Sequence, residues 1–306
     1  MRIFLTGATG YIGAAVLVSL VRGGHDVTAL VRHQEKARLV AKRGGHPIVG
    51  NLAAPGSFRA ALDGQDGYVH AAYDSRSGRG PAIERAALET ILAAARRPPT
   101  AGSTASARFV IYTSGVWILG RTSDPATEDT PINPIEHVAW RPKQEQLVLD
   151  AGTGGLRTVV VRPGVVYGGG AGIICDLFSA ASNGLVRVVG GGSNRWPLVY
   201  DRDLADLYAR LVTREDASGV YHANDEGDER VCDLVDAIIP HVPVRPDVRY
   251  VPIEEARQKM GAYADALALD QVVRSPRARA LGWAPSLRSV AGNAARLIEE
   301  WRASKN

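Results

Sequence analysis

The residues with the clearest chemical purpose are the glycines of TGATGYIG, which occupies positions 6–13 between a strand-like run and a helical stretch. Gly7 permits a tight turn, Gly10 lets the backbone approach a pyrophosphate, and Gly13 allows the helix to pack closely on the strand. The first turn of that helix would offer free N–H groups and its positive dipole end to the phosphates. The spacing predicts a dinucleotide site made by Gly7, Thr9, Gly10, Tyr11, Ile12 and Gly13.

The residue after the second predicted strand, VTALV (27–31), discriminates between the two nicotinamide dinucleotides. A site selective for NAD(H) places Asp or Glu there to accept from the ribose hydroxyls, whereas this chain has Arg32. The guanidinium suits a 2′-phosphate, although it could instead stack on the adenine. His33 and Lys36 would add positive charge nearby, or belong to a solvated helix start. We expect NADP(H) as the cofactor, with NAD(H) as the alternative.

Two other strand ends are expected to border the cofactor. Ala71 and Ala72 close the fourth strand-like run, and their small side chains would let a dinucleotide pass over the strand end. Asn51 and Leu52 lie at the end of the third run, where a contact with the adenine ring is usual.

Short apolar runs alternate with stretches of helical periodicity along the first half of the chain. Strands this apolar on both faces are typical of a parallel sheet that helices cover. The predicted strands are 2–7, 27–31, 47–51, 68–72, 109–114 and 156–164. The predicted helices are 11–23, 33–43, 55–62, 83–96 and 138–151. This alternation predicts an α/β fold with a doubly wound parallel Rossmann sheet.

The alternation breaks after about residue 165, where glycine-rich segments follow one another. We therefore assign residues 1–165 and about 195–225 to a dinucleotide-binding Rossmann domain. Residues 166–194 and about 226–306 are assigned to a smaller, interleaved C-terminal substrate-binding lobe.

Four further segments have a predicted structure. Residues 201–213 are predicted to form a helix that returns to the sheet, and residues 220–224 a strand. Residues 286–303 carry apolar side chains at helical spacing, which predicts a helix near the end of the chain. The segment Pro98–Ala107, rich in Pro, Ser, Thr and Ala, is interpreted as a mobile surface connection.

Composition argues against several classes of protein. The formal charge is +4, but the basic residues are scattered and aromatic residues make up only 6%, so no nucleic-acid-binding stripe emerges. Cys175 and Cys232 lie far apart, which fits free thiols and implies neither a disulfide nor a metal site. The sequence shows no signal-peptide pattern and no apolar run near the roughly 20 residues of a membrane span. We expect a cytoplasmic protein with a small-molecule substrate and no nucleic-acid or membrane partner; a homodimer is left open.

Motifs spread over nearly the whole chain resemble the extended short-chain dehydrogenase/reductase superfamily. Besides TGATGYIG they are YTSGVWILG (112–120), Lys143 followed by QEQLVLDAG, VRPGVVYG (161–168), GGGSNRWPLVYDRDLADLY (190–208) and SPRARALGWAP (275–285). Within the superfamily the chain looks most like an atypical subgroup of NAD(P)-dependent epimerase/dehydratase-like proteins. The resemblance implies an NADP-dependent oxidoreductase or epimerase-like enzyme that acts on a small carbonyl or alcohol substrate.

The usual chemistry of the superfamily implies a Tyr-x-x-x-Lys pair on a helix and a hydroxyl residue after the fifth strand. Lys143 matches the lysine, which would bind the cofactor ribose, but Ala139 stands where the tyrosine is expected. Ser114 or Thr113 would be the hydroxyl that donates to the substrate carbonyl; alternatively, both only line the cofactor channel. Pro163, in VRPGVVYG, is expected to contact the cofactor.

Several side chains could replace the missing tyrosine. Tyr73, at the end of the fourth strand, is our first choice as the acid. The alternatives are His137, Tyr167 and Tyr200, of which the two tyrosines also suit the core or the substrate wall. Trp117 and Trp140 are expected to pack against substrate or nicotinamide, because an indole N–H does not ionise usefully.

Arg195 falls where sugar-nucleotide members of the superfamily place an arginine against the substrate diphosphate, which implies an anionic substrate. The alternative is an ion pair with Asp201 or Asp203. A function of a different class also stays open. Loss of the tyrosine would allow a catalytically silent NADP(H)-binding sensor or regulatory protein.

Overall fold

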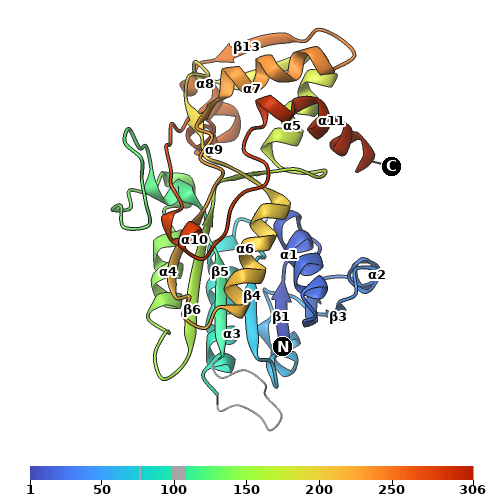
Figure 1. Cartoon of the computed structure of the whole chain (residues 1–306), viewed down its shortest axis with the longest axis vertical. Helices are drawn as coiled ribbons and strands as arrows, with labels where there is room; N and C mark the ends of the chain where they lie inside the picture. Colours follow the sequence, from blue (N-terminus) through green and yellow to red (C-terminus); the bar gives the residue numbers. More distant parts are fainter. Residues whose placement is uncertain (76, 98–107, 306) are drawn as a thin grey trace. The chain divides into compact units, whose positions relative to one another are not determined.

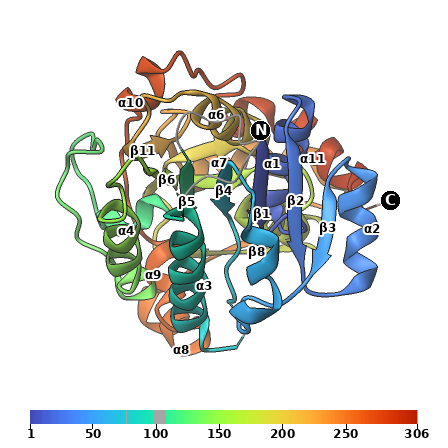
Figure 2. The ribbon, with the colours of Figure 1, turned by 90° about the horizontal axis from the view of Figure 1, so that it is seen from below.

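Seven strands form one sheet in the computed structural model, which describes residues 1–75, 77–97 and 108–305. Their order is β11-β6-β5-β4-β1-β2-β3, and each pair from β3 to β6 is parallel (Figure 2). The strands are β1 Arg2–Thr6, β2 Asp26–Val31, β3 His46–Val49, β4 Gly67–His70, β5 Phe109–Thr113, β6 Arg157–Pro163 and β11 Gly219–Ala223. The chain winds outward from β1 in both directions, so the predicted doubly wound Rossmann sheet is confirmed.

The described residues divide into two units, which we treat separately. The first comprises Met1–Ser114, Trp140–Arg162 and Leu204–Tyr221, and the second Gly115–Ala139, Pro163–Asp203 and His222–Asn306. The second unit thus takes in residues 115–139, which the sequence-based division placed in the dinucleotide-binding domain. The predicted connection Pro98–Ala107 lies outside the described residues.

Along the chain, α-helices lie between the strands of this sheet (Figure 1). Five of them are α1 Tyr11–Arg22, α2 Gln34–Lys42, α3 Gly80–Ala95, α4 Arg141–Leu149 and α6 Asp201–Thr213. Helices α3 and α4 cover the face of the sheet that presents Phe4, Tyr68 and Tyr112, all of them buried. Burial of these rings on one face and of Leu5 and Ile111 on the other explains why the strands read as continuously apolar.

The single helix predicted over 55–62 is wrong. The structure has two short 3-10 helices there, η1 Pro55–Ser57 and η2 Arg59–Leu62. Between them Phe58 has φ −128°, outside the helical range, and its buried ring stacks on Phe4 with the ring centroids 5.9 Å apart. Packing of one aromatic side chain into the core therefore interrupts the helical backbone.

The second unit contains three two-stranded ladders and six α-helices among its described residues. The ladders pair β7 Val165–Tyr167 with β10 Leu198–Tyr200, β9 Arg195–Trp196 with β12 Glu229–Arg230, and β8 Leu185–Val189 with β13 Asp247–Val251. The helices are α5 Ile173–Ser182, α7 Val231–Ile238, α8 Ile253–Met260, α9 Tyr263–Leu267, α10 Pro276–Ala280 and α11 Ala294–Ala303. Short 3-10 helices are η3 Val116–Leu119, η4 Glu136–Val138, η5 Ile239–His241 and η6 Ala291–Asn293.

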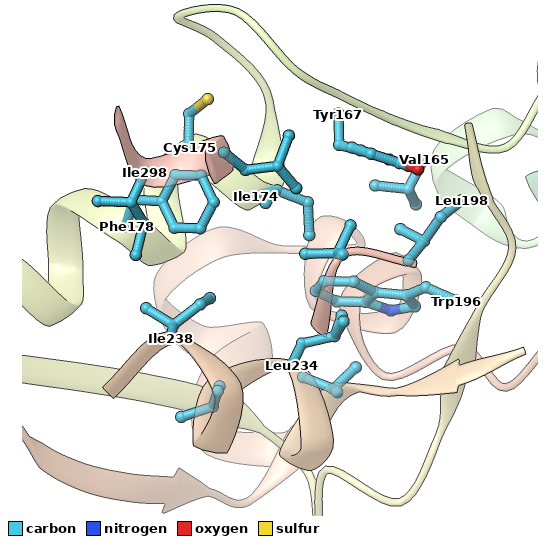
Figure 3. Packing of buried hydrophobic residues seen from close by; sticks show 14 of the residues in the cluster. Val165, Tyr167, Ile174, Cys175, Phe178, Trp196, Leu198, Leu234, Ile238 and Ile298 are labelled. Carbon is cyan, nitrogen blue, oxygen red and sulfur yellow. The ribbon is translucent and has the colours of Figure 1, made fainter. Parts of the chain in front are cut away.

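The core of the second unit is formed by side chains from α5, α7, α11 and the short strands. Phe178 and Ile174 of α5 pack with Trp196, Leu234 and Ile298 (Figure 3). Cys175 belongs to this core, whereas Cys232 is half-buried, and both thiols are free. Burial, with a smaller contribution from Asp176, raises the pKa of the Cys175 thiol to about 12.

The helix predicted over 286–303 is only partly correct, because α11 begins at Ala294 and a single 3-10 turn precedes it. Carboxylates, instead of helical carbonyls, accept the N–H groups of the preceding residues. Asp203 accepts from the backbone of Ser286 and Leu287, and Glu229 accepts from the backbone of Val290 and Ala291. These long-range contacts hold the segment out of the helix that its apolar spacing favours.

Within the described part of the chain, no helix combines the length and apolar character that a membrane span needs.

Candidate active site

The glycine turn between β1 and α1 is tightly packed against its neighbours. Gly7 has φ +79°, and a Cβ atom there would lie 2.4 Å from the carbonyl oxygen of Ala71. A Cβ atom at Gly13 would lie 2.2 Å from the carbonyl oxygen of Gly7. The backbone N–H of Gly10 donates to that same oxygen at 2.8 Å and closes the turn. Gly7 and Gly13 are therefore required by the fold itself.

Gly10 plays a different part in this turn. It is the N-cap residue of α1, is exposed, and makes no side-chain cap. The nearest neighbour of a Cβ atom at Gly10 would be the carbonyl oxygen of Gly7 at 3.2 Å. An open helix N-terminus without a side-chain cap fits the pyrophosphate of a dinucleotide. Thr9 is also exposed, and Tyr11 and Ile12 are half-buried.

The other predicted cofactor residues lie at the ends of the neighbouring strands. Arg32 directly follows β2 and is exposed, as are His33 and Lys36. The Asn51 side-chain oxygen accepts the N–H of Ala53 at 3.0 Å, which makes a local turn after β3. Leu52 packs partly on the core, Ala71 and Ala72 are half-buried after β4, and Pro163 is the buried last residue of β6.

The two predicted hydroxyl residues at the end of β5 differ in their bonding. Thr113 is hydrogen-bonded to the phenol of the buried Tyr208 at 2.5 Å. The N–H of Ser114 donates to Val161 at 2.7 Å, but its buried hydroxyl has no hydrogen-bond partner in the described structure. A buried polar group that is unpaired in the protein is a candidate for pairing with a ligand. Of the two hydroxyls, that of Ser114 is the one without a hydrogen-bond partner among the described residues.

Lys143, the lysine that the superfamily resemblance implies, and Arg141 lie two residues apart on α4. Lys143 is exposed on α4, and no hydrogen bond to its ammonium is found in the described structure. Arg141, two residues earlier, donates from one guanidinium nitrogen to the Thr113 carbonyl and to the Tyr112 hydroxyl, each at 3.3 Å. Residues two apart on an α-helix point in very different directions, and Arg141 is the residue of this pair that contacts the backbone next to Ser114.

Two aromatic rings, the exposed Tyr73 and the half-buried Trp140, lie beside Arg141. Tyr73 and Trp140 stack with their ring centroids 5.0 Å apart and their planes 7° from parallel. The guanidinium carbon of Arg141 lies 4.5 Å from the Trp140 centroid and 5.5 Å from the Tyr73 centroid. Burial, then the nearby Glu84, raises the pKa of the Tyr73 phenol, which makes Tyr73 a weaker acid than a free tyrosine.

The alternatives to Tyr73 lie in the second unit. His137 and Ala139 are exposed, and the His137 ring contacts Trp117 and Tyr263, with centroids 6.0 and 5.4 Å apart. The Tyr167 hydroxyl is buried and donates to the Leu287 carbonyl at 3.0 Å. Tyr200 contacts the Glu300 carboxylate at 2.9 Å. Both tyrosine hydroxyls are thus bonded within the protein.

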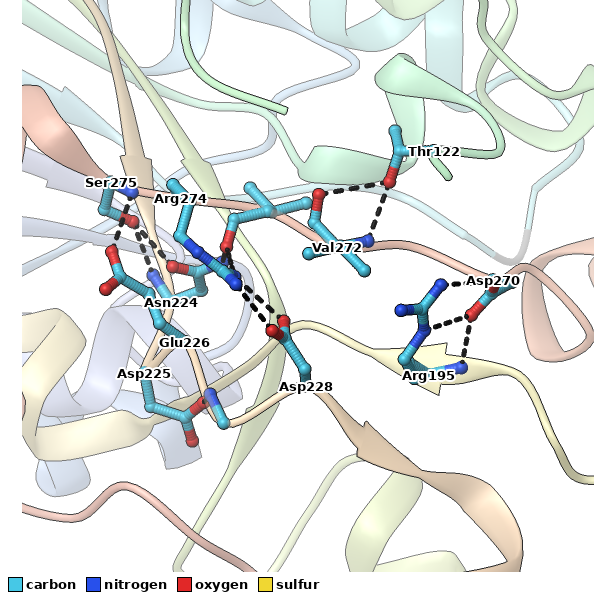
Figure 4. Close-up of polar contacts among 12 residues, drawn as sticks. Thr122, Arg195, Asn224, Asp225, Glu226, Asp228, Asp270, Val272, Arg274 and Ser275 are labelled. Carbon is cyan, nitrogen blue, oxygen red and sulfur yellow. Dashed lines mark hydrogen bonds and ion pairs between the residues drawn. The ribbon is translucent and has the colours of Figure 1, made fainter. Parts of the chain in front are cut away.

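Arg195 is paired with neither Asp201 nor Asp203. Asp270 accepts from its Nε at 2.9 Å, from its terminal nitrogen at 2.8 Å and from its backbone N–H at 2.7 Å (Figure 4). The Arg195 guanidinium holds the pKa of Asp270 below its usual range. A cavity of about 270 Å³ in the second unit adjoins this pair, and its lining includes Arg121, Gly190, Asn194, Ile253 and Asp270.

Sequence comparison places these features in a family. The family model described as the NAD dependent epimerase/dehydratase family matches residues 3–223, which include the glycine turn and the end of β5. The chain belongs to this family. An uncharacterized protein of Schizosaccharomyces pombe is 29% identical over 94% of this chain and 95% of its own length.

Two further proteins that this chain is similar to have informative names. A 4-hydroxy-2-methyl-3-oxo-4-farnesyl-3,4-dihydroquinoline-1-oxide ketoreductase of Stigmatella aurantiaca is 29% identical over 84% of this chain and 78% of its own length. The human epimerase family protein SDR39U1, solved with NADPH, superposes with a TM-score of 0.79 over 98% of this chain and 99% of its own, at 20% identity. The structural match shows that the fold is shared.

Three functional candidates were missed by sequence reasoning. Arg141 and Glu84 lie outside the quoted motifs, Tyr112 begins YTSGVWILG without having been assigned a role, and packing of α3 and α4 on β5 brings the three together. In the described residues, no three His, Cys, Asp or Glu side chains lie close enough together to hold a metal ion.

Proposed function

We propose that this chain is an NADP(H)-dependent oxidoreductase that reduces a small carbonyl compound or oxidises the corresponding alcohol. The observation that carries the proposal is the unpaired, buried hydroxyl of Ser114 at the end of β5, in a unit whose β1–α1 turn is open to a dinucleotide. Bound NADPH would supply the hydride. Ser114 would donate its hydroxyl hydrogen to the substrate carbonyl oxygen and orient it.

Arg141 supplies the positive charge in this proposal. Its guanidinium is held at the carbonyl of Thr113, next to Ser114, where it favours the negative charge that develops on a carbonyl oxygen during reduction. The tyrosine that serves as general acid in the superfamily is proposed to be missing, because Ala139 stands four residues before Lys143, where that tyrosine is expected. Tyr73 is a weaker acid than a free tyrosine, because its pKa is raised. Without a general acid, which typically contributes 10²–10⁴-fold, turnover is expected to be slow.

The pairing of Arg195 bears on the substrate. The Asp270 carboxylate offsets the charge of the Arg195 guanidinium and takes two of its N–H groups, which makes Arg195 a weaker ligand for a diphosphate. This supports an uncharged carbonyl substrate over a sugar nucleotide, and the ketoreductase name of the Stigmatella aurantiaca relative agrees with it.

We predict that NADPH binds more tightly than NADH, and that Arg32→Ala reduces the difference. Arg32 is exposed directly after β2, with His33 and Lys36 nearby, so removal of its charge should weaken NADPH binding about tenfold and leave NADH binding nearly unchanged. Fluorescence titration of both cofactors measures this. Equal affinities for the two cofactors in the unmodified protein would refute the NADP(H) preference.

A matched pair of variants tests which cation serves the site. Arg141→Met should lower kcat for NADPH-dependent carbonyl reduction by about 10²-fold, because the developing charge loses its nearest cation. Lys143→Met should change kcat little, since Lys143 is exposed on the same helix. Loss of NADPH absorbance with a panel of ketones and aldehydes provides the assay.

The opposite order of effects would restore Lys143 as the functional cation. Tight NADPH binding with no turnover of any carbonyl or alcohol would instead favour the sensor function over the oxidoreductase.

A further inference from the structure

A buried carboxyl group lies behind the end of β5. Glu84 of α3 is 2% exposed, and its Oε1 accepts a hydrogen bond from the Tyr112 hydroxyl at 2.5 Å. Its second oxygen is buried and has no hydrogen-bond partner among residues 1–75, 77–97 and 108–305. A half-satisfied buried carboxyl is costly to a fold and needs an explanation.

The same tyrosine connects Glu84 to Arg141. The Tyr112 oxygen accepts from Arg141 at 3.3 Å while its O–H donates to Glu84, and the guanidinium nitrogen lies 4.0 Å from Glu84 Oε1. Arg141 also donates to the Thr113 carbonyl at 3.3 Å. A continuous chain of contacts therefore runs from Glu84 through Tyr112 and Arg141 to the backbone beside Ser114.

We propose that Glu84 is a positioning residue that, through Tyr112, holds Arg141 at the end of β5 and sets the net positive charge beside Ser114. The inference rests on the proposed function, because it gives the Arg141 charge a role at that site. When Glu84 is ionised, its carboxylate compensates the guanidinium. When Glu84 is protonated, Arg141 presents its full charge.

The environment of Glu84 predicts that its carboxylate gains or loses its proton near neutral pH. Burial raises the pKa of Glu84 to about 7, against the opposing effects of Arg141 and the Tyr112 hydrogen bond. The other titratable groups on the packed elements are Tyr68 and His70 of β4, Tyr73 after β4, Lys143 and Glu145 of α4, and the exposed Arg59 and Asp63 by η2. Burial lowers the pKa of His70 to about 4, so His70 stays neutral through this range.

Titration of the carboxyl group tests the positioning without cofactor or turnover. By infrared or carbon NMR spectroscopy, a carboxyl signal that titrates near pH 7 should disappear in Glu84→Gln, whereas the signal of Asp225, whose pKa burial also raises to about 7, should remain. Arg141→Met and Tyr112→Phe should each raise that pKa, because each removes an interaction that favours the charged form. Glu89→Gln, an exposed carboxyl on the same helix, is the matched control and should leave the signal in place.

The ratio of the Kd of NADP⁺ to the Kd of NADPH tests the effect on the site. The oxidised nicotinamide is positively charged, so it is disfavoured most when Arg141 is uncompensated. The ratio should fall by about threefold or more as pH rises from roughly 6 to 8, and should lose this dependence in Glu84→Gln.

The outcomes separate the two proposals. If Glu84→Gln removes no carboxyl signal that titrates near neutrality, or if Arg141→Met leaves the pKa of the Glu84 signal unchanged, Glu84 does not position Arg141, and the inference is overturned whatever the enzyme does. If the pKa of Glu84 responds to Arg141→Met but the ratio of the two Kd values does not change with pH, Glu84 does not control the charge at the cofactor site. If neither NADP⁺ nor NADPH binds although the pKa of Glu84 still responds to Arg141→Met, the proposed function is refuted and the positioning of Arg141 by Glu84 is not.

Discussion

Replacement of Glu145 by Gln should lower the free energy of unfolding by about 3–5 kcal/mol, because it leaves the buried Arg162 guanidinium without its counter-ion. Arg162 of β6 gives three hydrogen bonds of 2.6–3.1 Å to the Glu145 carboxylate of α4. Their side chains are only 6% and 4% exposed, so water cannot compensate for the loss. Equilibrium urea unfolding followed by circular dichroism measures the change.

An exposed pair provides the control for this experiment. Arg85 and Glu89 of α3 form an ion pair of 2.9 Å in which each side chain is half exposed, so Glu89→Gln should cost less than 1 kcal/mol. A double replacement of Glu145 and Arg162 by methionine should recover much of the stability, because both buried charges are then removed. Equal losses for Glu145→Gln and Glu89→Gln would show that the buried pair contributes no more than the exposed one.

Replacement of Gly10 by Val should weaken NADPH binding at least about 100-fold, or about 2.8 kcal/mol, while the fold persists. A side chain at Gly10 enters the space above the N-terminus of α1 that the pyrophosphate requires, yet its Cβ atom would come no closer than 3.2 Å to its nearest neighbour. Fluorescence titration measures the affinity, and far-ultraviolet circular dichroism reports the fold.

Two other glycines serve as comparisons. Gly56→Ala adds a methyl group where nothing lies within 4 Å, so binding and stability should be unchanged. Gly13→Ala should destabilise the protein itself, since its Cβ atom would lie 2.2 Å from the Gly7 carbonyl oxygen. If Gly10→Val bound NADPH as tightly as the unmodified protein, the dinucleotide site would lie elsewhere.

The parts of the fold that the sequence predicted correctly depend on local patterns. Gly7, Gly10 and Gly13 lie where β1 leads into α1, and the apolar runs of the central strands follow from burial on both faces, whereas the edge strand β3 is only partly buried. The helix expected over 55–62 is wrong because the ring of Phe58 packs on Phe4, a contact across more than fifty residues that no local pattern encodes.

The candidate site was harder to predict for the same reason. The superfamily motif predicts Lys143 as a cation of the site. In the structure, Arg141, two residues earlier, contacts the end of β5. Glu84 looks like an ordinary helical glutamate in the sequence, and only its burial against Tyr112 distinguishes it. Charged residues that act through tertiary contacts leave no periodic signal.

The two thiols differ in their expected reactivity, which allows the protein to be labelled at one cysteine. Nucleophilic attack on an alkylating reagent requires a thiolate, and the Cys175 thiol remains protonated at any pH at which the protein would be handled. Cys232 is only half-buried, at the start of α7 in the second unit, and lies outside the Glu84 cluster. A maleimide dye should therefore attach at one position, and single-molecule or anisotropy measurements can begin from the unmodified sequence.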